Sequence, residues 1–132
     1  MADKPVVDIP GTVPPAELEL EDLVTGEGEE AVVGSTVSAH YVGVSWSTRQ
    51  QFDASWDRGQ PLTFQLGAGQ VISGWDTGIQ GMRVGGRRRI TIPPHLGYGD
   101  RGVPQAGIRG GDTLVFVVDI LDAQASATPS AN

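Results

Sequence analysis

The sequence contains no cysteine, so disulfide bonds and thiolate metal sites are excluded. It also has no apolar run near the ~20 residues that a membrane-spanning helix needs, and its first residues lack the apolar core of a secretory signal peptide. The two histidines, His40 and His95, lie far apart and have no partners at ligand spacing. We therefore expect a cytoplasmic protein with no metal, no other cofactor and no membrane contact.

Positive charge is scarce, and the negative charge is concentrated at one end. Residues 1–30 carry nine acidic residues and a single lysine, whereas the remaining 102 residues carry seven acidic and eight basic ones. Because nucleic-acid binding needs a positively charged surface, this balance argues against a nucleic-acid partner. The three consecutive arginines at 87–89 are interpreted as the solvated start of a strand, since three bases alone make a poor phosphate-binding patch.

The chain of 132 residues is long enough for one domain with a real core. Residues 1–16 are rich in proline and predict an extended lead-in, the domain is expected over 17–122, and residues 123–132 predict a flexible tail. Alternating or continuous apolar patterns predict strands over 17–21, 36–44, 62–66, 87–92 and 113–121, of which the last should be central. The first is expected to be half-buried through Leu18 and Leu20. Between the last two strands, residues 93–112 form a long, glycine- and proline-rich loop of the kind that is usually functional.

One stretch, residues 66–82, predicts a short helix, although its propensity is poor. Gly74, Gly78 and Gly81 each cost about 1 kcal/mol relative to alanine in a helix. Apolar side chains nevertheless recur at helical spacing, which favours one face packed onto a sheet: Val71, Ile72, Trp75, Ile79 and Met82. The predicted fold is α+β, a five- to six-stranded antiparallel sheet wrapped around one short helix.

Several short motifs occur in a distinctive order. They are Tyr41-Val42-Gly43, Phe52-Asp53-Ala54-Ser55, Val71-Ile72-Ser73-Gly74-Trp75, Gly97-Tyr98-Gly99 and Leu114-Val115-Phe116. In order and spacing they resemble the FKBP-type peptidyl-prolyl cis-trans isomerases, over residues 17–122, and the compact length resembles the small single-domain bacterial members.

The resemblance implies an aromatic pocket for the proline ring. Trp75 would form its floor, and the walls would come from Tyr41, Phe52, Val71, Ile72 and Phe116, with Leu62 and Ile108 nearby. The Ile72 N–H and the Tyr98 hydroxyl would donate hydrogen bonds to ligand carbonyls. Asp53 would be a polar group at the pocket edge, held by Tyr41 and Arg58, and residues 97–109 would form a flap. Leu62 stands where the family often has phenylalanine.

The activity that the resemblance implies is rotation about X–Pro bonds of proline-containing polypeptides during folding. A monomer with no bound cofactor would suffice, and macrolides such as tacrolimus and rapamycin would be expected to inhibit it. The alternative is a binding module, either a receptor for proline motifs or macrolides or a chaperone-like holdase, in which the same pocket binds with little or no turnover.

Overall fold

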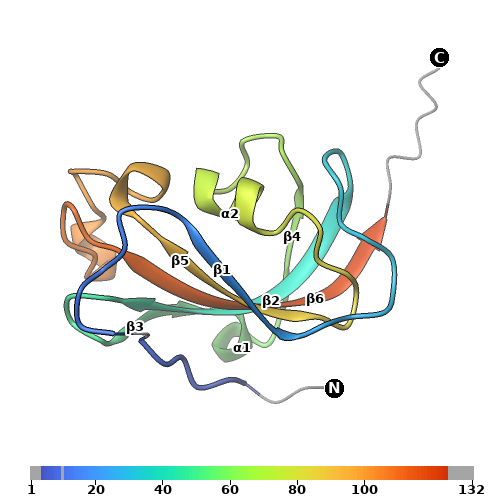
Figure 1. The fold of residues 1–132 in the computed structure, drawn as a ribbon, viewed down its shortest axis with the longest axis horizontal. Helices are drawn as coiled ribbons and strands as arrows, with labels where there is room; N and C mark the ends of the chain where they lie inside the picture. Colours follow the sequence, from blue (N-terminus) through green and yellow to red (C-terminus); the bar gives the residue numbers. More distant parts are fainter. Residues whose placement is uncertain (1–3, 10, 125–132) are drawn as a thin grey trace.

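The computed structural model describes residues 4–9 and 11–124. Its elements follow the order β1 (Glu19–Val24), β2 (Thr36–Ser45), β3 (Gln51–Ala54), α1 (Ser55–Arg58), β4 (Leu62–Gln65), α2 (Ser73–Gly78), β5 (Arg87–Ile92), two short 3-10 turns at Pro94–Leu96 and Pro104–Ala106, and β6 (Leu114–Gln124) (Figure 1). No helix in this part of the chain is long and apolar enough to span a membrane.

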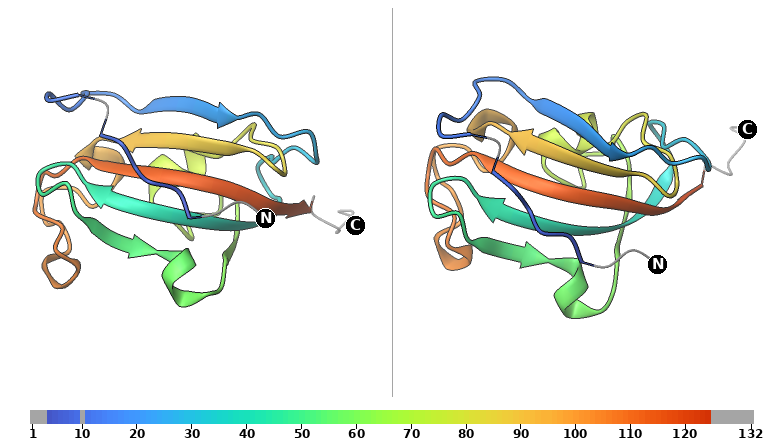
Figure 2. Two further views of the ribbon diagram at one scale, coloured as in Figure 1. Left: turned by 90° about the horizontal axis from the view of Figure 1, so that it is seen from below. Right: turned by 60° about the horizontal axis from the view of Figure 1, so that its bottom comes forward.

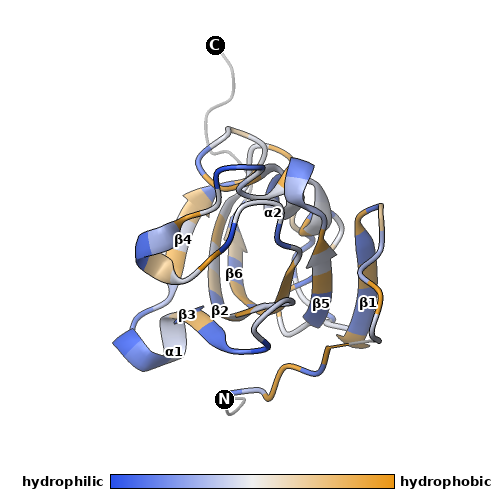
Figure 3. Cartoon of the chain, turned by 90° about the vertical axis from the view of Figure 1, so that its left-hand side faces the viewer, coloured by the Kyte–Doolittle hydropathy of each residue, from blue (hydrophilic) through white to orange (hydrophobic). Residues whose placement is uncertain are grey.

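All strand pairings are antiparallel, in the order β1-β5-β6-β2-β3, with β4 also paired to β2. The first half of β2 pairs with β4 and its second half with β3, so β3 and β4 share one edge, with α1 between them. The predicted central position of the last strand is confirmed, because β6 lies between β5 and β2. α2 lies over the concave face of the sheet (Figures 1 and 3).

The structure differs from the sequence prediction at the ends and at the edges. β1 begins at Glu19, and all its residues are exposed because it is an edge strand; only Leu18, just before it, packs against the core. β3 and α1 were not predicted. β6 continues through Ala123 and Gln124, so two residues of the predicted tail belong to the sheet. Residues 125–132 lie outside the described residues.

The concave face holds the main core, and the convex face is covered by the lead-in. Val42, Val44, Val115 and Val117 are buried but alternate with core residues such as Tyr41 and Phe116, and they do not belong to the core cluster. Residues 4–9 cross β6 on this convex face (Figure 2), with Pro5, Val7 and Ile9 half-buried. Residues 4–9 therefore cover an apolar surface of the sheet without forming a helix or a strand.

Candidate functional site

A pocket of about 380 Å³ opens between α2 and the strands. Its lining comes from separate parts of the chain and is mostly apolar: Tyr41, Phe52, Asp53, Leu62, Gln70, Val71, Ile72, Trp75, Tyr98 and Phe116. Nine of these ten residues are site residues that the sequence predicted. The tenth, Gln70, directly precedes Val71-Ile72 and accepts a hydrogen bond from the Gln65 N–H through its side-chain oxygen (2.8 Å). Its position beside the motif was the only signal for it.

Glycines bring α2 close enough to the sheet to form the pocket floor. A Cβ atom on Gly74 would lie 2.6 Å from the Ile92 side chain, and one on Gly78 would lie 3.1 Å from that of Ile90. The two glycines lower the helix propensity of this segment, but they allow α2 to lie close to β5. Trp75 lies between the two glycines and is only 3 % exposed.

Asp76, on the other side of α2, fixes the loop that leads into the helix. Its carboxylate accepts hydrogen bonds from the N–H groups of Gly67 (2.8 Å) and Gly69 (3.0 Å). Further along, the Trp75 N–H bonds to the Ile72 carbonyl (2.9 Å) as α2 begins. These contacts hold Val71 and Ile72 at the pocket wall.

The Trp75 ring is surrounded by the rings of other aromatic residues. Tyr41 and Phe116 meet it edge-on, with ring centroids 4.9 and 5.3 Å away and interplanar angles of 85° and 88°. Phe52 in turn meets Phe116 edge-on at 5.5 Å. Such edge-to-face contacts are the geometry that aromatic pairs prefer. The Trp75 indole N–H is buried and has no hydrogen-bond partner among the described residues.

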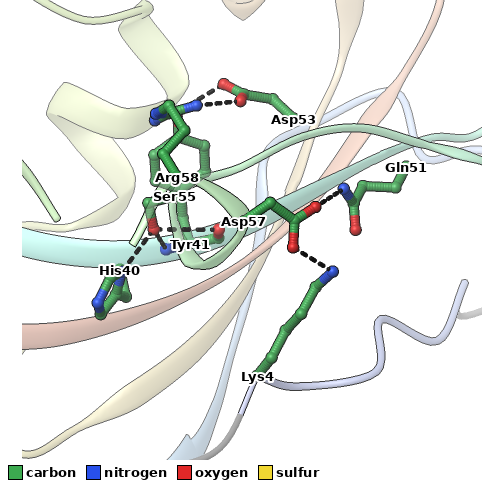
Figure 4. Close-up of polar contacts among 8 residues, drawn as sticks. All are labelled: Lys4, His40, Tyr41, Gln51, Asp53, Ser55, Asp57 and Arg58. Atoms are coloured by element: carbon green, nitrogen blue, oxygen red, sulfur yellow. Dashed lines mark hydrogen bonds and ion pairs between the residues drawn. The ribbon is translucent and has the colours of Figure 1, made fainter. Parts of the chain in front are cut away.

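A polar triad forms one edge of the pocket (Figure 4). The Tyr41 hydroxyl donates to the Asp53 carboxylate (2.5 Å), and the Arg58 guanidinium donates to both Asp53 (2.5 Å) and the Tyr41 oxygen (2.8 Å). Burial, followed by the hydrogen bond to Asp53, raises the pKa of Tyr41 above its ordinary value. The phenol is therefore neutral at physiological pH, and it orients the carboxylate. Arg58 contacts Asp53 and Tyr41 but does not itself line the pocket.

α1 begins with a buried hydroxyl that fastens it to β2. Ser55 accepts a hydrogen bond from the Tyr41 N–H (2.7 Å) and bonds to His40 Nδ1 (2.8 Å) (Figure 4). The His40 ring also stacks on Trp56 with ring centroids 4.3 Å apart. These contacts place α1, and with it Arg58, beside the pocket edge.

Two groups expected to bind a ligand are available at the rim. Neither the Tyr98 hydroxyl nor the Ile72 N–H forms a hydrogen bond within the described residues. Burial, together with the nearby charge of Asp53, raises the pKa of Tyr98, so this phenol also keeps its proton at neutral pH. Both groups can donate to a carbonyl oxygen of a bound molecule.

Ile108, which was expected near the pocket, does not line it. It is 2 % exposed, belongs to the main core cluster and forms an isolated β-bridge with Val103, but it is not one of the lining residues. The expected flap is also more ordered than its sequence indicates. The 3-10 turn at Pro104–Ala106 and this bridge organise it, and Ile108 holds it to the core.

The three arginines of β5 are not solvated, which corrects the sequence interpretation. Arg87 pairs with Asp119, Arg88 with Asp22 and Arg89 with Glu21. The cause lies in the register, which places β5 between two strands that carry acidic residues at matching positions. Sequence reasoning missed these pairs because the acidic partners are far away in the chain.

Comparison with known proteins identifies the family. The family model described as FKBP-type peptidyl-prolyl cis-trans isomerase matches residues 27–121. The chain is 60 % identical to an FK506-binding protein of Streptomyces anulatus, over 90 % of this chain and 96 % of the relative. It is 46 % identical to a probable FK506-binding protein of Corynebacterium glutamicum, over 92 % of this chain and 99 % of that relative.

Solved structures give the same result. The crystal structure of AtFKBP13 has a TM-score of 0.75 at 42 % identity and covers 86 % of this chain and 98 % of its own. That of FkpA from Escherichia coli has a TM-score of 0.73 at 38 % identity and covers 83 % of this chain and 49 % of its own. By fold, by family model and by its bacterial relatives, this chain belongs to the FKBP-type peptidyl-prolyl cis-trans isomerases.

Proposed function

We propose that the aromatic pocket over Trp75 is the catalytic site, and that it accelerates X–Pro rotation by favouring the twisted amide. The observation that carries the proposal is the mostly apolar lining of the pocket. Tyr41 and Phe116 meet the ring of Trp75 edge-on, and the polar groups lie at the rim. Rotation breaks no bond, so catalysis here needs no nucleophile and no obligatory proton transfer.

The energetics of the reaction fit such a pocket. The barrier to amide rotation is about 20 kcal/mol because rotation removes the resonance that makes the planar amide polar. The twisted amide is less polar, so an apolar pocket disfavours it less than it disfavours the planar form, which is preferential binding of the transition state. Lowering the barrier by about 6 kcal/mol would accelerate rotation on the order of ten-thousandfold.

The polar rim would hold the substrate around the rotating bond. We assign the Ile72 N–H and the Tyr98 hydroxyl to substrate carbonyls, since both donors lack partners within residues 4–9 and 11–124. Asp53 would act at the pocket edge, oriented by Tyr41 and Arg58. Phe52, Leu62, Val71 and Phe116 would contact the proline ring and its neighbours.

The same pocket would bind macrolides of the tacrolimus and rapamycin type. The supporting observations are the names of the relatives, which are FK506-binding proteins, and a pocket volume within the range of about 300–1,000 Å³ typical of small-molecule sites. Proline-containing polypeptides are the proposed natural partners. A monomeric state, a cytoplasmic location and the absence of nucleic-acid or membrane partners stay predictions.

Exchange NMR on a proline-containing peptide tests this function. We expect the wild-type protein at micromolar concentration to accelerate exchange and Phe116→Ala to lose most of the acceleration. Val117→Ala is the matched control, because Val117 is the buried neighbour of Phe116 on the convex face. Equal losses in the two variants would contradict the proposal. A proline ligand that binds without any acceleration by the wild type would favour the binding module instead.

A further inference from the structure

The second arginine of β5, Arg88, lies beneath the C-terminal end of α2, the helix that carries the pocket floor. Its side chain is 11 % exposed and points to the concave face. One guanidinium nitrogen, Nη1, donates to the Gly78 carbonyl (2.6 Å) and the Gln80 carbonyl (3.2 Å). Carbonyl groups at a helix C-terminus lack partners within the helix, so this arginine supplies partners that α2 cannot.

Asp22 of the edge strand β1 fixes the orientation of that guanidinium. Its two carboxylate oxygens accept from Arg88 Nε (2.6 Å) and Nη2 (3.3 Å), a two-point contact that leaves Nη1 directed at α2. Asp22 is directly opposite Arg88 in the β1–β5 register. The acidic strand at the start of the domain is thereby connected through one side chain to the helix of the pocket.

The alternate residues of β5 form a row along α2. Ile92 lies against Gly74, Ile90 lies against Gly78, and Arg88 binds the carbonyls where the helix ends. The two Gly–Ile contacts set how close α2 lies to the sheet, but apolar surfaces can slide along one another. The hydrogen bonds of Arg88 are directional, and they fix the helix along its own axis.

We propose that Arg88, oriented by Asp22, is a positioning residue for catalysis: it fixes α2 along its axis and so places Trp75 under the proline ring. The polar partners of Arg88 are Asp22, Gly78 and Gln80, none of which lines the pocket, so it acts through the helix. The inference rests on the proposed catalytic role of the pocket. Because α2 has only six residues, about one and a half turns, it has little stability of its own to keep Trp75 in place.

Arg89 provides a matched control. It is the next residue of the same strand, it carries the same charge and it pairs with Glu21, the neighbour of Asp22, but it lies on the opposite face of the sheet. Arg88→Met and Arg89→Met therefore remove the same charge and the same kind of ion pair. Only Arg88→Met removes the contacts with α2.

The test compares these variants at a temperature at which each is folded. We expect Arg88→Met to lower kcat/KM for a proline peptide on the order of tenfold, since misplacing a reacting group by about 1 Å can cost on the order of a hundredfold. Arg88→Lys should recover part of the loss, Asp22→Asn should lose less than Arg88→Met, and Arg89→Met should match the wild type. The fluorine NMR signal of 5-fluorotryptophan at Trp75, assigned with Trp75→Phe, should move in Arg88→Met and stay in place in Arg89→Met.

A role in stability alone would give different results. In that case Arg88→Met would lower the melting temperature while kcat/KM and the Trp75 signal of the folded protein stayed at wild-type values, and the proposal would be wrong. Equal losses in Arg88→Met and Arg89→Met would also overturn it. If instead Phe116→Ala retained full activity, the proposed catalytic role of the pocket would fail, whatever the arginine variants showed.

Discussion

The two helices beside the pocket are both short, but they are held in opposite ways. α2 lies on the sheet through buried contacts of Gly74 and Gly78, and it carries the floor residue Trp75. α1 is a four-residue turn with no side-chain N-cap, and it carries Arg58 at the polar edge. Its outward contact is the Lys4–Asp57 pair (2.8 Å), in which both side chains are about half-exposed (Figure 4).

The site therefore combines a floor that is packed on the sheet with an edge whose charged side chains, Arg58 and Asp53, are partly exposed, although buried Ser55 fastens the start of α1 to β2. A change in side-chain volume at a packed contact destabilises the fold, whereas exposed ion pairs contribute little to stability and are weakened by salt. Substitutions under α2 should therefore reduce stability and activity together. Substitutions of the exposed charged residues of α1, Asp57 and Arg58, should change activity or titration with little effect on stability.

The largest effect is expected for Gly74→Ala. The new methyl group would lie 2.6 Å from the Ile92 side chain, so the helix must move, at a cost of about 1–3 kcal/mol in unfolding free energy and with loss of most activity. Chemical denaturation and exchange NMR measure the two effects. Gly78→Ala is the control, because its closest contact is 3.1 Å and alanine favours a helix by about 1 kcal/mol, so it should stay near the wild type. Equal destabilisation by both would show that close approach is not what positions α2.

A smaller, selective effect is expected for Arg58→Met. The charged hydrogen bonds to Asp53 and Tyr41 are lost, but the side chain is half-exposed, so we expect about a fivefold loss of kcat/KM with little change in stability. The Arg58 hydrogen bond lowers the pKa of Tyr41, so its removal should raise that pKa further. Ultraviolet titration of the phenol measures this shift, and a fall in the Tyr41 pKa would contradict the triad.

Alkaline pH should lower the free energy of unfolding through the two tyrosines, one of which belongs to the triad. The chain has two tyrosines, Tyr41 and Tyr98, and the pKa of each is raised, mainly by burial, above the ordinary value of 10.0. A raised pKa means that the folded state binds the proton more tightly than the unfolded state. The resulting contribution of the neutral phenol to the free energy of unfolding is complete below pH 10.0 and is lost as pH rises through the folded pKa. Denaturation across this range should show the loss, and Tyr41→Phe should reduce it. A stability that rises with alkaline pH would exclude this assignment.

The smallest effect is expected for Lys4→Met, which releases the lead-in from α1. Both side chains of the Lys4–Asp57 pair are about half-exposed, so unfolding free energy and kcat/KM should both stay close to wild-type values. The hydrogen bond from Lys4 lowers the pKa of Asp57 below its ordinary value of 3.8, and this pKa should return toward that value in the variant. Carboxylate titration by NMR checks the change. A large loss of activity would show that the exposed Lys4–Asp57 ion pair positions the edge of the pocket.

Local patterns predicted the concave half of the molecule well. The strand around Tyr41 and the central strand around Phe116 are confirmed, because each combines a clear apolar period with a family motif. The helix around Trp75 is also present, but it is shorter than predicted: α2 covers Ser73–Gly78 instead of residues 66–82, and Gly69 and Gly81, on either side of it, adopt positive φ angles. Nine of the ten pocket-lining residues had been expected from the resemblance to the family, because local patterns alone do not bring distant residues together.

The buried arginine, the sheet edge and the place of Ile108 could not be predicted because their causes are distant in sequence. Arg88 is buried because Asp22 and the end of α2 meet it, and neither is near it in the chain. β1 is exposed because it lies at the sheet edge, a consequence of topology. Ile108 carries no periodic pattern that would distinguish a core contact from a pocket wall.

The most direct test of the account is exchange NMR on a proline peptide with and without one equivalent of tacrolimus, while Trp75 fluorescence reports pocket occupancy in a Trp46→Phe/Trp56→Phe background. We predict that the acceleration disappears in proportion to the fraction of pockets filled. Acceleration that persists while the pocket is full would contradict the central claim that X–Pro rotation takes place over Trp75.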